Sequence, residues 1–304
     1  MKKVAISIGD INGVGIQLAL QNHTRVKKLC EPIYCIDKEI LNQASKKLNI
    51  LVPHDFRTTG KYTDVKINPG VVTRDSGLFS YNSFMRAIQL VKVKKADAIC
   101  TMPINKESWE KAGINYVGHT DMLRDIFKKN AIMMLGCKKM FVALYTEHIP
   151  LKDVPKQIKY KKLVKFFVDF YNCIDYQEPI GVLGLNPHAG DNGVLGDEET
   201  VILKAMKKAS KIVNNRFDLL VPDIAFTPHV RKQYKYFIAM YHDQGLAPLK
   251  ALYFDKSINV SLNLPIIRTS VDHGTAFDIA YKKNNNLSSK SYINAIKEAV
   301  ELSK

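Results

Sequence analysis

The sequence predicts an α/β protein with a largely parallel sheet, and two patterns carry this prediction. Short, continuous apolar runs alternate with longer segments in which apolar residues recur every three or four positions, as in strands covered on both faces by helices. Several apolar runs also end in a polar residue, and ligands of such sheets bind beyond the carboxyl ends of the strands. With 304 residues, the chain has room for one large domain or two of ordinary size.

Strands and helices are predicted to alternate along the whole chain. In the first half, strands are predicted at residues 4–10, 32–37 and 96–103, and helices at 15–29, 39–48 and 79–93. In the second half, strands are predicted at 140–148, 179–188 and 236–243, and helices at 162–174, 198–213, 276–283 and 291–303. The strand runs are short and continuously apolar, whereas the helical segments are longer and have one apolar face.

The composition narrows the classes of function. The chain has 45 basic and 29 acidic residues, a net charge of +16, which nucleic acid or an anionic small molecule could use. The lysines are spread over helical faces, and no aromatic, glycine-studded basic module of an RNA binder is found, so we predict no nucleic-acid partner.

The five cysteines form no repeated CxxC, which argues against a disulfide framework and a cysteine metal site. Since the apolar run at residues 4–8 is too short for a signal peptide and no run reaches the roughly 20 residues of a membrane span, we expect a cytoplasmic protein without a membrane partner.

Three histidines share one context, because each ends an apolar run: His148, His188 and His242. Imidazole nitrogens suit zinc, cobalt, nickel or iron, and three protein ligands leave positions open for a substrate. No compact HExxH spacing is present. A metal site and a structural hydrogen-bonding role for each histidine therefore both stay open from the pattern alone.

Two further segments have the character of ligand-binding loops. Residues 186–199 are rich in glycine and open a helix whose first turn is acidic, which suits the helix dipole; they form either a capped loop or a loop that presents His188 to a ligand. His119 and Thr120 stand at a predicted helix start. Thr120 is there either an N-cap or part of an N-terminus that receives a carboxylate or phosphate.

A set of cationic and amide side chains follows His242 within 26 residues: Lys250, Asn259 and Arg268. Each alone has the character of a surface residue, but together they could clamp a phosphate, to which arginine offers two parallel hydrogen bonds.

The first loop resembles a dinucleotide fingerprint, but its glycines at 9, 13 and 15 do not make GxGxxG. We therefore do not favour a classical dinucleotide fold.

Taken together, these segments resemble a known family. The stretches "NPHAG", "AMYHDQGLAPLK" and "LPIIRTSVDHGTA", with "GHT" and the His-Ile-Pro-Leu after "FVALYT", are similar to the 4-hydroxythreonine-4-phosphate dehydrogenases of vitamin B6 synthesis. The likeness covers nearly the whole chain. It implies an isocitrate/isopropylmalate dehydrogenase-like fold with two α/β/α domains around a cleft, and a homodimer with a shared active site.

The resemblance also implies domain limits and site residues. One domain comprises residues 1–125 with 260–304 and carries the nucleotide-binding segment; the other, 126–259, carries most metal ligands and the dimer interface. The implied cofactors are NAD or NADP and one divalent metal ion per subunit, zinc, magnesium or cobalt. The implied metal ligands are His148, His188 and His242; the substrate-binding residues are His119, Thr120, Lys250, Asn259 and Arg268; the cofactor-binding residues are Asp272, His273, Gly274 and Thr275; and the catalytic base is Asp243 or Asp223.

Three departures from the family pattern concern the cofactor contacts more than the metal site. The first loop reads "GDINGVGIQ" where the family has an acid-Pro-Ala-Gly-Ile-Gly-Pro-acid motif. Tyr281 stands where a glycine is usual, and "FDKSIN" replaces a more glycine-rich approach to Asn259.

The implied reaction is the NAD-dependent, metal-dependent oxidation of 4-phosphohydroxy-L-threonine, followed by decarboxylation to 3-amino-2-oxopropyl phosphate. A related dehydrogenase of 4-phosphoerythronate or 4-phosphothreonate is the alternative. A more distant alternative is a non-catalytic anion-binding protein, suggested by the charge of +16; it predicts no stoichiometric metal and no NADH formation.

Overall fold

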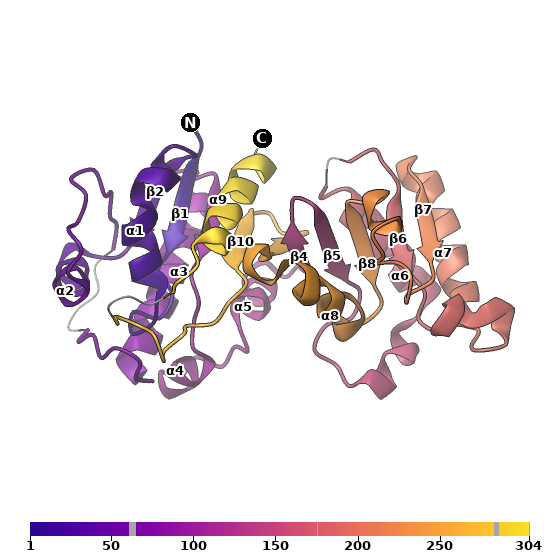
Figure 1. Ribbon diagram of the computed structural model, residues 1–304, viewed down its shortest axis with the longest axis horizontal. Helices are drawn as coiled ribbons and strands as arrows, with labels where there is room; N and C mark the ends of the chain where they lie inside the picture. The colour runs from indigo at the N-terminus through magenta and orange to yellow at the C-terminus, as the bar shows by residue number, and fades with distance from the viewer. Residues whose placement is uncertain (61–64, 175, 283–285, 304) are drawn as a thin grey trace. The chain divides into compact units, whose positions relative to one another are not determined.

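A computed structural model describes residues 1–60, 65–174, 176–282 and 286–303. The chain divides into two compact units: unit 1 comprises Met1–Lys129 with Ile258–Lys304, and unit 2 comprises Asn130–Ser257. The divisions expected from the sequence lie after residue 125 and before residue 260. Each unit is a sheet with helices packed on it (Figure 1).

The sheet of unit 1 has the strand order β2-β1-β3-β10-β9. Its strands are β1 (Lys3–Ser7), β2 (Glu31–Cys35), β3 (Ala98–Thr101), β9 (Ile258–Leu262) and β10 (Arg268–Val271). All neighbours are parallel except β9 and β10, which are antiparallel. The helices are α1 (Gly15–Lys27), α2 (Lys38–Leu48), α3 (Arg74–Lys92), α4 (Lys106–Lys111), α5 (His119–Phe127) and α9 (Lys290–Leu302).

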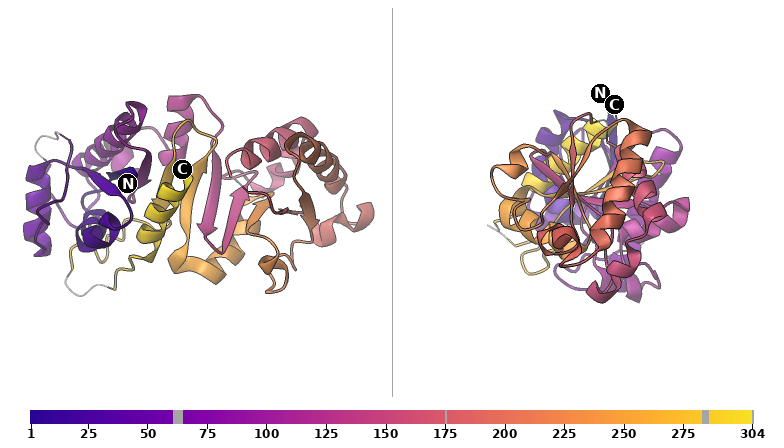
Figure 2. Two further views of the ribbon diagram at one scale, coloured as in Figure 1. Left: turned by 90° about the horizontal axis from the view of Figure 1, so that it is seen from above. Right: turned by 90° about the vertical axis from the view of Figure 1, so that its right-hand side faces the viewer.

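Helices cover both faces of this sheet (Figure 2). On one face, Phe84 of α3, Trp109 of α4 and Leu123 of α5 pack with Ile99 of β3 in one apolar cluster. On the other face lies α9, to whose backbone the Thr269 hydroxyl of β10 donates a hydrogen bond. Burial on both faces explains why the strands are continuously apolar rather than alternating.

The sheet of unit 2 has the order β4-β5-β8-β6-β7. Its strands are β4 (Ile132–Cys137), β5 (Met140–Leu144), β6 (Ile180–Leu183), β7 (Phe217–Leu220) and β8 (Tyr236–Ala239). Only the β4–β5 pair is antiparallel among the pairings within this unit. The α-helices are α6 (Tyr160–Tyr171), α7 (Glu198–Val213) and α8 (His242–Tyr253).

The α/β prediction with a largely parallel sheet is confirmed, but one predicted helix is wrong. Residues 277–281 form turns instead of the helix expected over 276–283, of which residue 283 lies outside the described part. Ala276 has φ of 47° and Tyr281 has φ of 61°, a left-handed conformation that a right-handed helix excludes. The sequence-based prediction also omits strands β4, β7, β9 and β10 and helices α4 and α8.

The described residues contain no helix long and apolar enough to cross a bilayer. All five cysteines are free thiols, and four of them are buried.

Candidate functional site

Strand pairing in unit 1 gathers polar side chains on one face of the sheet. Antiparallel pairing places Arg268 opposite Ser261, and Ser270 opposite Asn259. Parallel pairing with β3 places Thr101 beside Ser270. Because alternate residues of a strand share a face, Thr101, Arg268, Ser261 and Asn259 all belong to the face that α3, α4 and α5 cover.

Arg268 is the centre of this cluster and is only 2% exposed. Its Nε and Nη2 donate to Thr101 Oγ1 at 3.1 and 2.8 Å, and its Nη1 donates to Ser261 Oγ at 3.1 Å. Burial lowers the pKa of the guanidinium to about 10, so the group stays positively charged at neutral pH. Within the described part of the chain, no carboxylate pairs with it. A buried cation without an anion is costly, and the arrangement is therefore suited to an anionic ligand.

His119 lies beside this cation and begins α5 as predicted. Its ring packs against Phe84 at 4.6 Å and Trp109 at 5.7 Å between centroids. Burial, and secondarily the charge of Arg268, hold the pKa of His119 well below its usual 6.5, so the imidazole is neutral. Its Nε2 is buried and has no hydrogen-bond partner among the described residues, which leaves one polar atom for a ligand.

Thr120 and Asn259 complete the polar face. Thr120 is not the N-cap of α5, because Gly118 occupies that position and no side chain caps it. Instead Thr120 Oγ1 lies 3.3 Å from Ser261 Oγ. Asn259 Oδ1 is buried and also lacks a protein partner in the described part of the chain. Of the predicted substrate-binding residues, the structure thus brings His119, Thr120, Asn259 and Arg268 together within unit 1.

The fifth predicted substrate-binding residue, Lys250, belongs to unit 2. It lies in the last turn of α8, where a cation is favourable for the helix dipole. Its Nζ is 5.5 Å from the centroid of the Phe254 ring. Its predicted role in binding phosphate stays a prediction.

Two of the three predicted metal ligands lie side by side in unit 2. The rings of His148 and His242 are 5.4 Å apart between centroids. His242 is the first residue of α8 rather than the end of strand β8. Its Nδ1 lies 2.7 Å from Asp243 Oδ1, which leaves Nε2 as the nitrogen that can bind a metal, in the usual pairing of a ligating histidine with a carboxylate.

The third predicted ligand, His188, lies in the loop Pro187–Gly193, whose central residues are not helical. From His188 to Asn192 all five residues have positive φ, between 42° and 80°. Glu199 of α7 anchors the start of this loop by accepting hydrogen bonds from the backbone N–H groups of Leu185 and Asn186, at 2.7 and 2.8 Å. The acidic first turn of α7 therefore fixes the loop as well as suiting the helix dipole.

Over the described residues, no three His, Cys, Asp or Glu side chains gather closely enough to hold a metal ion. The structure therefore does not bring His188 to His148 and His242. The donor chemistry of the pair, with Asp243 behind His242, suits a divalent metal, and the site needs further ligands. Of the two predicted bases, Asp243 is engaged with His242, whereas Asp223 is exposed in the turn that follows β7.

The predicted cofactor segment, Asp272 to Thr275, packs on the first loop of unit 1. The Val14 N–H donates to the Thr275 carbonyl at 3.1 Å, and a Cβ at Gly13 would lie 2.8 Å from the same oxygen. Gly274 faces open space, because a Cβ added there would meet no atom within 4 Å in the described part of the chain. His273 Nε2 is buried without a partner among the described residues.

Tyr281 explains one departure from the family pattern. Its φ of 61° is a conformation that glycine adopts freely, so the usual glycine suits the backbone here. In this chain the Tyr281 hydroxyl donates to the Ile11 carbonyl of the first loop at 2.8 Å. The tyrosine thus ties together two segments that both depart from the family pattern.

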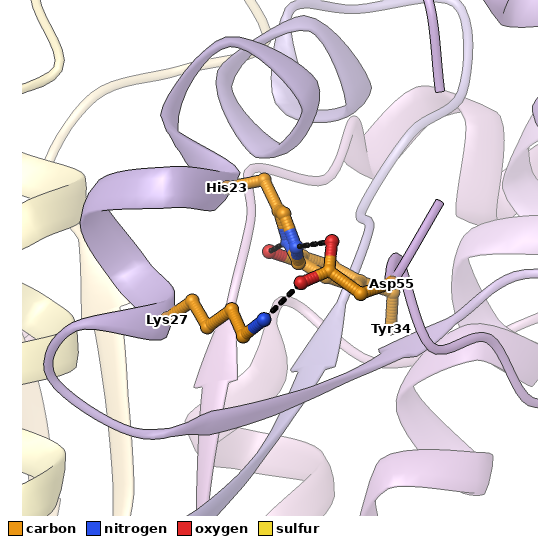
Figure 3. Close-up of polar contacts among 4 residues, drawn as sticks. All are labelled: His23, Lys27, Tyr34 and Asp55. Atoms are coloured by element: carbon orange, nitrogen blue, oxygen red, sulfur yellow. Dashed lines mark hydrogen bonds and ion pairs between the residues drawn. The ribbon is translucent and has the colours of Figure 1, made fainter. Parts of the chain in front are cut away.

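Another buried histidine, His23, belongs to a separate cluster that the sequence did not reveal (Figure 3). Its Nδ1 lies 3.0 Å from the Tyr34 hydroxyl, and its Nε2 lies 3.0 Å from Asp55 Oδ1. Lys27 forms an ion pair with the other oxygen of Asp55. The cluster joins α1, β2 and the loop around Asp55. Because protein groups bond to both ring nitrogens of His23, neither nitrogen is left for a ligand.

Comparison with known proteins gives a consistent picture. The family model of the pyridoxal phosphate biosynthetic protein PdxA matches residues 28–299. The 4-hydroxythreonine-4-phosphate dehydrogenase of Sulfurimonas denitrificans is 62% identical over 302 residues, covering 99% of this chain and 97% of the relative. The enzyme of the same name from Helicobacter pylori (strain HPAG1) is 46% identical, covering 97% and 98%. The crystal structure of a 4-hydroxythreonine-4-phosphate dehydrogenase from Burkholderia phymatum has a TM-score of 0.81 at 30% identity, covering 99% of this chain and 98% of the other.

Proposed function

Because the chain belongs to the PdxA family of pyridoxal phosphate biosynthetic proteins, we propose that it is a 4-hydroxythreonine-4-phosphate dehydrogenase. In this proposal it oxidises 4-phosphohydroxy-L-threonine with NAD or NADP, and the keto acid then loses carbon dioxide to give 3-amino-2-oxopropyl phosphate. The observation that carries the proposal is the buried guanidinium of Arg268, with which no carboxylate of the described residues pairs. Such a cation needs an anionic ligand, and the substrate has a phosphate and a carboxylate.

The residues of unit 1 would bind and orient the anionic substrate. Arg268 would neutralise one of its anionic groups through charge-assisted hydrogen bonds. The neutral imidazole of His119 and the Asn259 amide each have a buried atom without a protein partner in the described residues, and each would bond to a polar group of the substrate. Thr120 and, in unit 2, Lys250 stay in the proposal as further substrate-binding residues.

The metal would be held by His148 and His242, with His188 as the third ligand. When bound, a divalent ion supplies Lewis acidity that favours ionisation of a substrate hydroxyl. Asp243 holds the His242 ring through Nδ1 and so presents Nε2. Since Asp243 is engaged there, we assign the removal of the hydroxyl proton to the exposed Asp223. The segment Asp272–Thr275 would approach the nicotinamide cofactor, whose chemistry when bound would be that of a hydride acceptor.

We further propose a homodimer in which His188 comes from a second copy of the chain. Two arguments support this: His188 does not join the other two histidines among the described residues of one chain, and the family resemblance implies a shared site. Mixing His188→Ala with His242→Ala protein under subunit exchange tests it. Each mixed dimer would then have one intact site, which restores about a quarter of the wild-type activity at equal mixing. No recovery in verified mixed dimers would show that His188 and His242 of one site come from the same chain and would refute the shared arrangement.

A direct assay tests the activity. NADH formation is measured with 4-phosphohydroxythreonine, 4-phosphoerythronate and 4-phosphothreonate under the same conditions, and the aminoketone phosphate product is identified by mass. We expect the hydroxythreonine compound to have the highest kcat/KM. Preference for an acid that lacks the amino group would favour the related sugar-acid dehydrogenase instead, and no turnover of any of the three would refute the proposal.

A further inference from the structure

We propose that Thr101 and Ser261 are positioning residues for the anion-binding arginine: their hydroxyls fix the guanidinium of Arg268 in the orientation that receives the substrate's anionic end. The inference rests on the proposed function, because it takes Arg268 as a substrate-binding residue. Neither hydroxyl belongs to the set of residues that the sequence motifs indicate. Both reach Arg268 only through the strand pairing of unit 1.

Protein neighbours occupy every hydrogen-bonding position of the Thr101 hydroxyl. It accepts hydrogen bonds from Arg268 Nε at 3.1 Å and Nη2 at 2.8 Å, and it is 3.5 Å from the Thr269 carbonyl, to which it can donate. A hydroxyl has one proton and two lone pairs, so all of its capacity is assigned. Thr101 is 0% exposed, and water does not compete for these bonds. One edge of the guanidinium is thus fixed against β3.

The Ser261 hydroxyl holds the opposite part of the guanidinium and connects it to a second predicted substrate-binding residue. It accepts from Arg268 Nη1 at 3.1 Å and lies 3.3 Å from Thr120 Oγ1. Ser261 is 2% exposed and Thr120 is 7% exposed. One hydroxyl therefore fixes the relative positions of the β10 arginine and the start of α5.

The hydrogen-bond count of Arg268 shows what remains for a ligand. A guanidinium has five N–H groups, one on Nε and two on each terminal nitrogen. Three are donated to Thr101 and Ser261. One N–H on Nη1 and one on Nη2 have no acceptor among the described residues, and two is the number that a bidentate contact with phosphate or carboxylate requires.

The test removes each hydroxyl while keeping the shape of the side chain. Thr101→Val is compared with Thr101→Ser, which keeps the acceptor, and Ser261→Ala is measured beside them. Binding of 4-phosphohydroxythreonine without NAD is measured by calorimetry, and KM and kcat are measured by NADH formation. Loss of the two bonds from Arg268 to Thr101 should weaken substrate binding about 10- to 100-fold in Thr101→Val, and loss of the single bond to Ser261 should weaken it less in Ser261→Ala. Thr101→Ser should bind nearly as wild type, and the KM for NAD should stay unchanged in all three.

Thr269→Val is the matched control, because it removes a buried hydroxyl from β10, the strand of Arg268, on the opposite face of the sheet, where the bond is to the Ala295 carbonyl. It should lower the melting temperature and leave the KM for the substrate unchanged. If Thr101→Val binds the substrate as wild type does, the positioning role is refuted. Equal losses in Thr101→Val, Thr101→Ser and Thr269→Val would also refute it, because they would indicate a general effect on folding.

The same experiment separates this inference from the proposed function. Wild-type protein that binds none of the three phosphorylated acids would refute the function itself. Wild-type binding with no effect of the hydroxyls would refute only the positioning role. If Thr101→Val does not fold, Ser261→Ala decides by the same measurement, because weakened substrate binding at an unchanged melting temperature supports the role and unchanged binding overturns it.

Discussion

Replacing Arg268 by methionine should separate binding from stability. The side chain is 2% exposed and makes three hydrogen bonds to two hydroxyls, with no carboxylate partner in the described part of the chain. Methionine fills much of the same volume without the charge. Replacing a buried charged group by an apolar side chain of similar size is often neutral or stabilising, so the free energy of unfolding should change little.

The effect on the substrate should be large by comparison. Two N–H groups of Arg268 remain for an anion after the three internal bonds. A hydrogen bond to a charged group contributes roughly 1.5–3 kcal/mol, so two bonds at the lower figure give about 3 kcal/mol, a loss in kcat/KM on the order of 100-fold. Arg268→Lys should rescue only in part, because it keeps a charge but loses the planar fork.

Steady-state kinetics with both substrates varied, together with thermal unfolding, test this prediction. We expect the KM for the phosphorylated substrate to rise and the KM for NAD to stay nearly unchanged, while the melting temperature is maintained. An Arg268→Met enzyme with a normal KM for the substrate and a raised KM for NAD would show that Arg268 serves the cofactor. A large fall in melting temperature would show that the arginine is mainly a structural residue.

Three further predictions concern other parts of the chain. Enzyme activity should be lost after treatment with a chelator and should return when zinc, cobalt or magnesium is added. His242→Ala protein should contain no stoichiometric metal by elemental analysis. Full activity of verified metal-free protein would contradict the predicted metal dependence. The ion pair with Lys27 is the main cause that lowers the pKa of Asp55 from its usual 3.8 to about 2, so its contribution to stability is complete above pH 4 and is lost as the pH falls toward 2. Asp55→Asn should remove this pH-dependent part of the unfolding free energy, and the difference between the two proteins should be smallest at high salt. Identical curves of unfolding free energy against pH for the wild-type and Asp55→Asn proteins would contradict the role of Asp55. Gly13→Ala should raise the KM for NAD more than the KM for the substrate, because its Cβ would lie 2.8 Å from the Thr275 carbonyl; an unchanged KM for NAD would remove this loop from the cofactor site.

Local sequence signals predicted much of the fold. The apolar run at residues 4–10 overlaps strand β1, the run at 236–243 contains strand β8, and the helix start at His119 is where α5 begins. These features depend on neighbouring residues only, through strand composition and helix-end preferences. The same local reasoning gave a wrong helix over 276–283, because the periodic apolar residues there do not reveal the left-handed backbone at Ala276 and Tyr281.

The sequence by itself also determined the family and, through its motifs, the residues that gather around Arg268. What the tertiary structure decided is how they are held. Thr101 and Arg268 lie 167 positions apart, and Ser261 stands opposite Arg268 only because β9 and β10 pair in one particular antiparallel register. A shift of one residue in that register would turn Ser261 to the other face of the sheet. Register is set by the packing of both faces of the whole sheet, so no local stretch of sequence contains it.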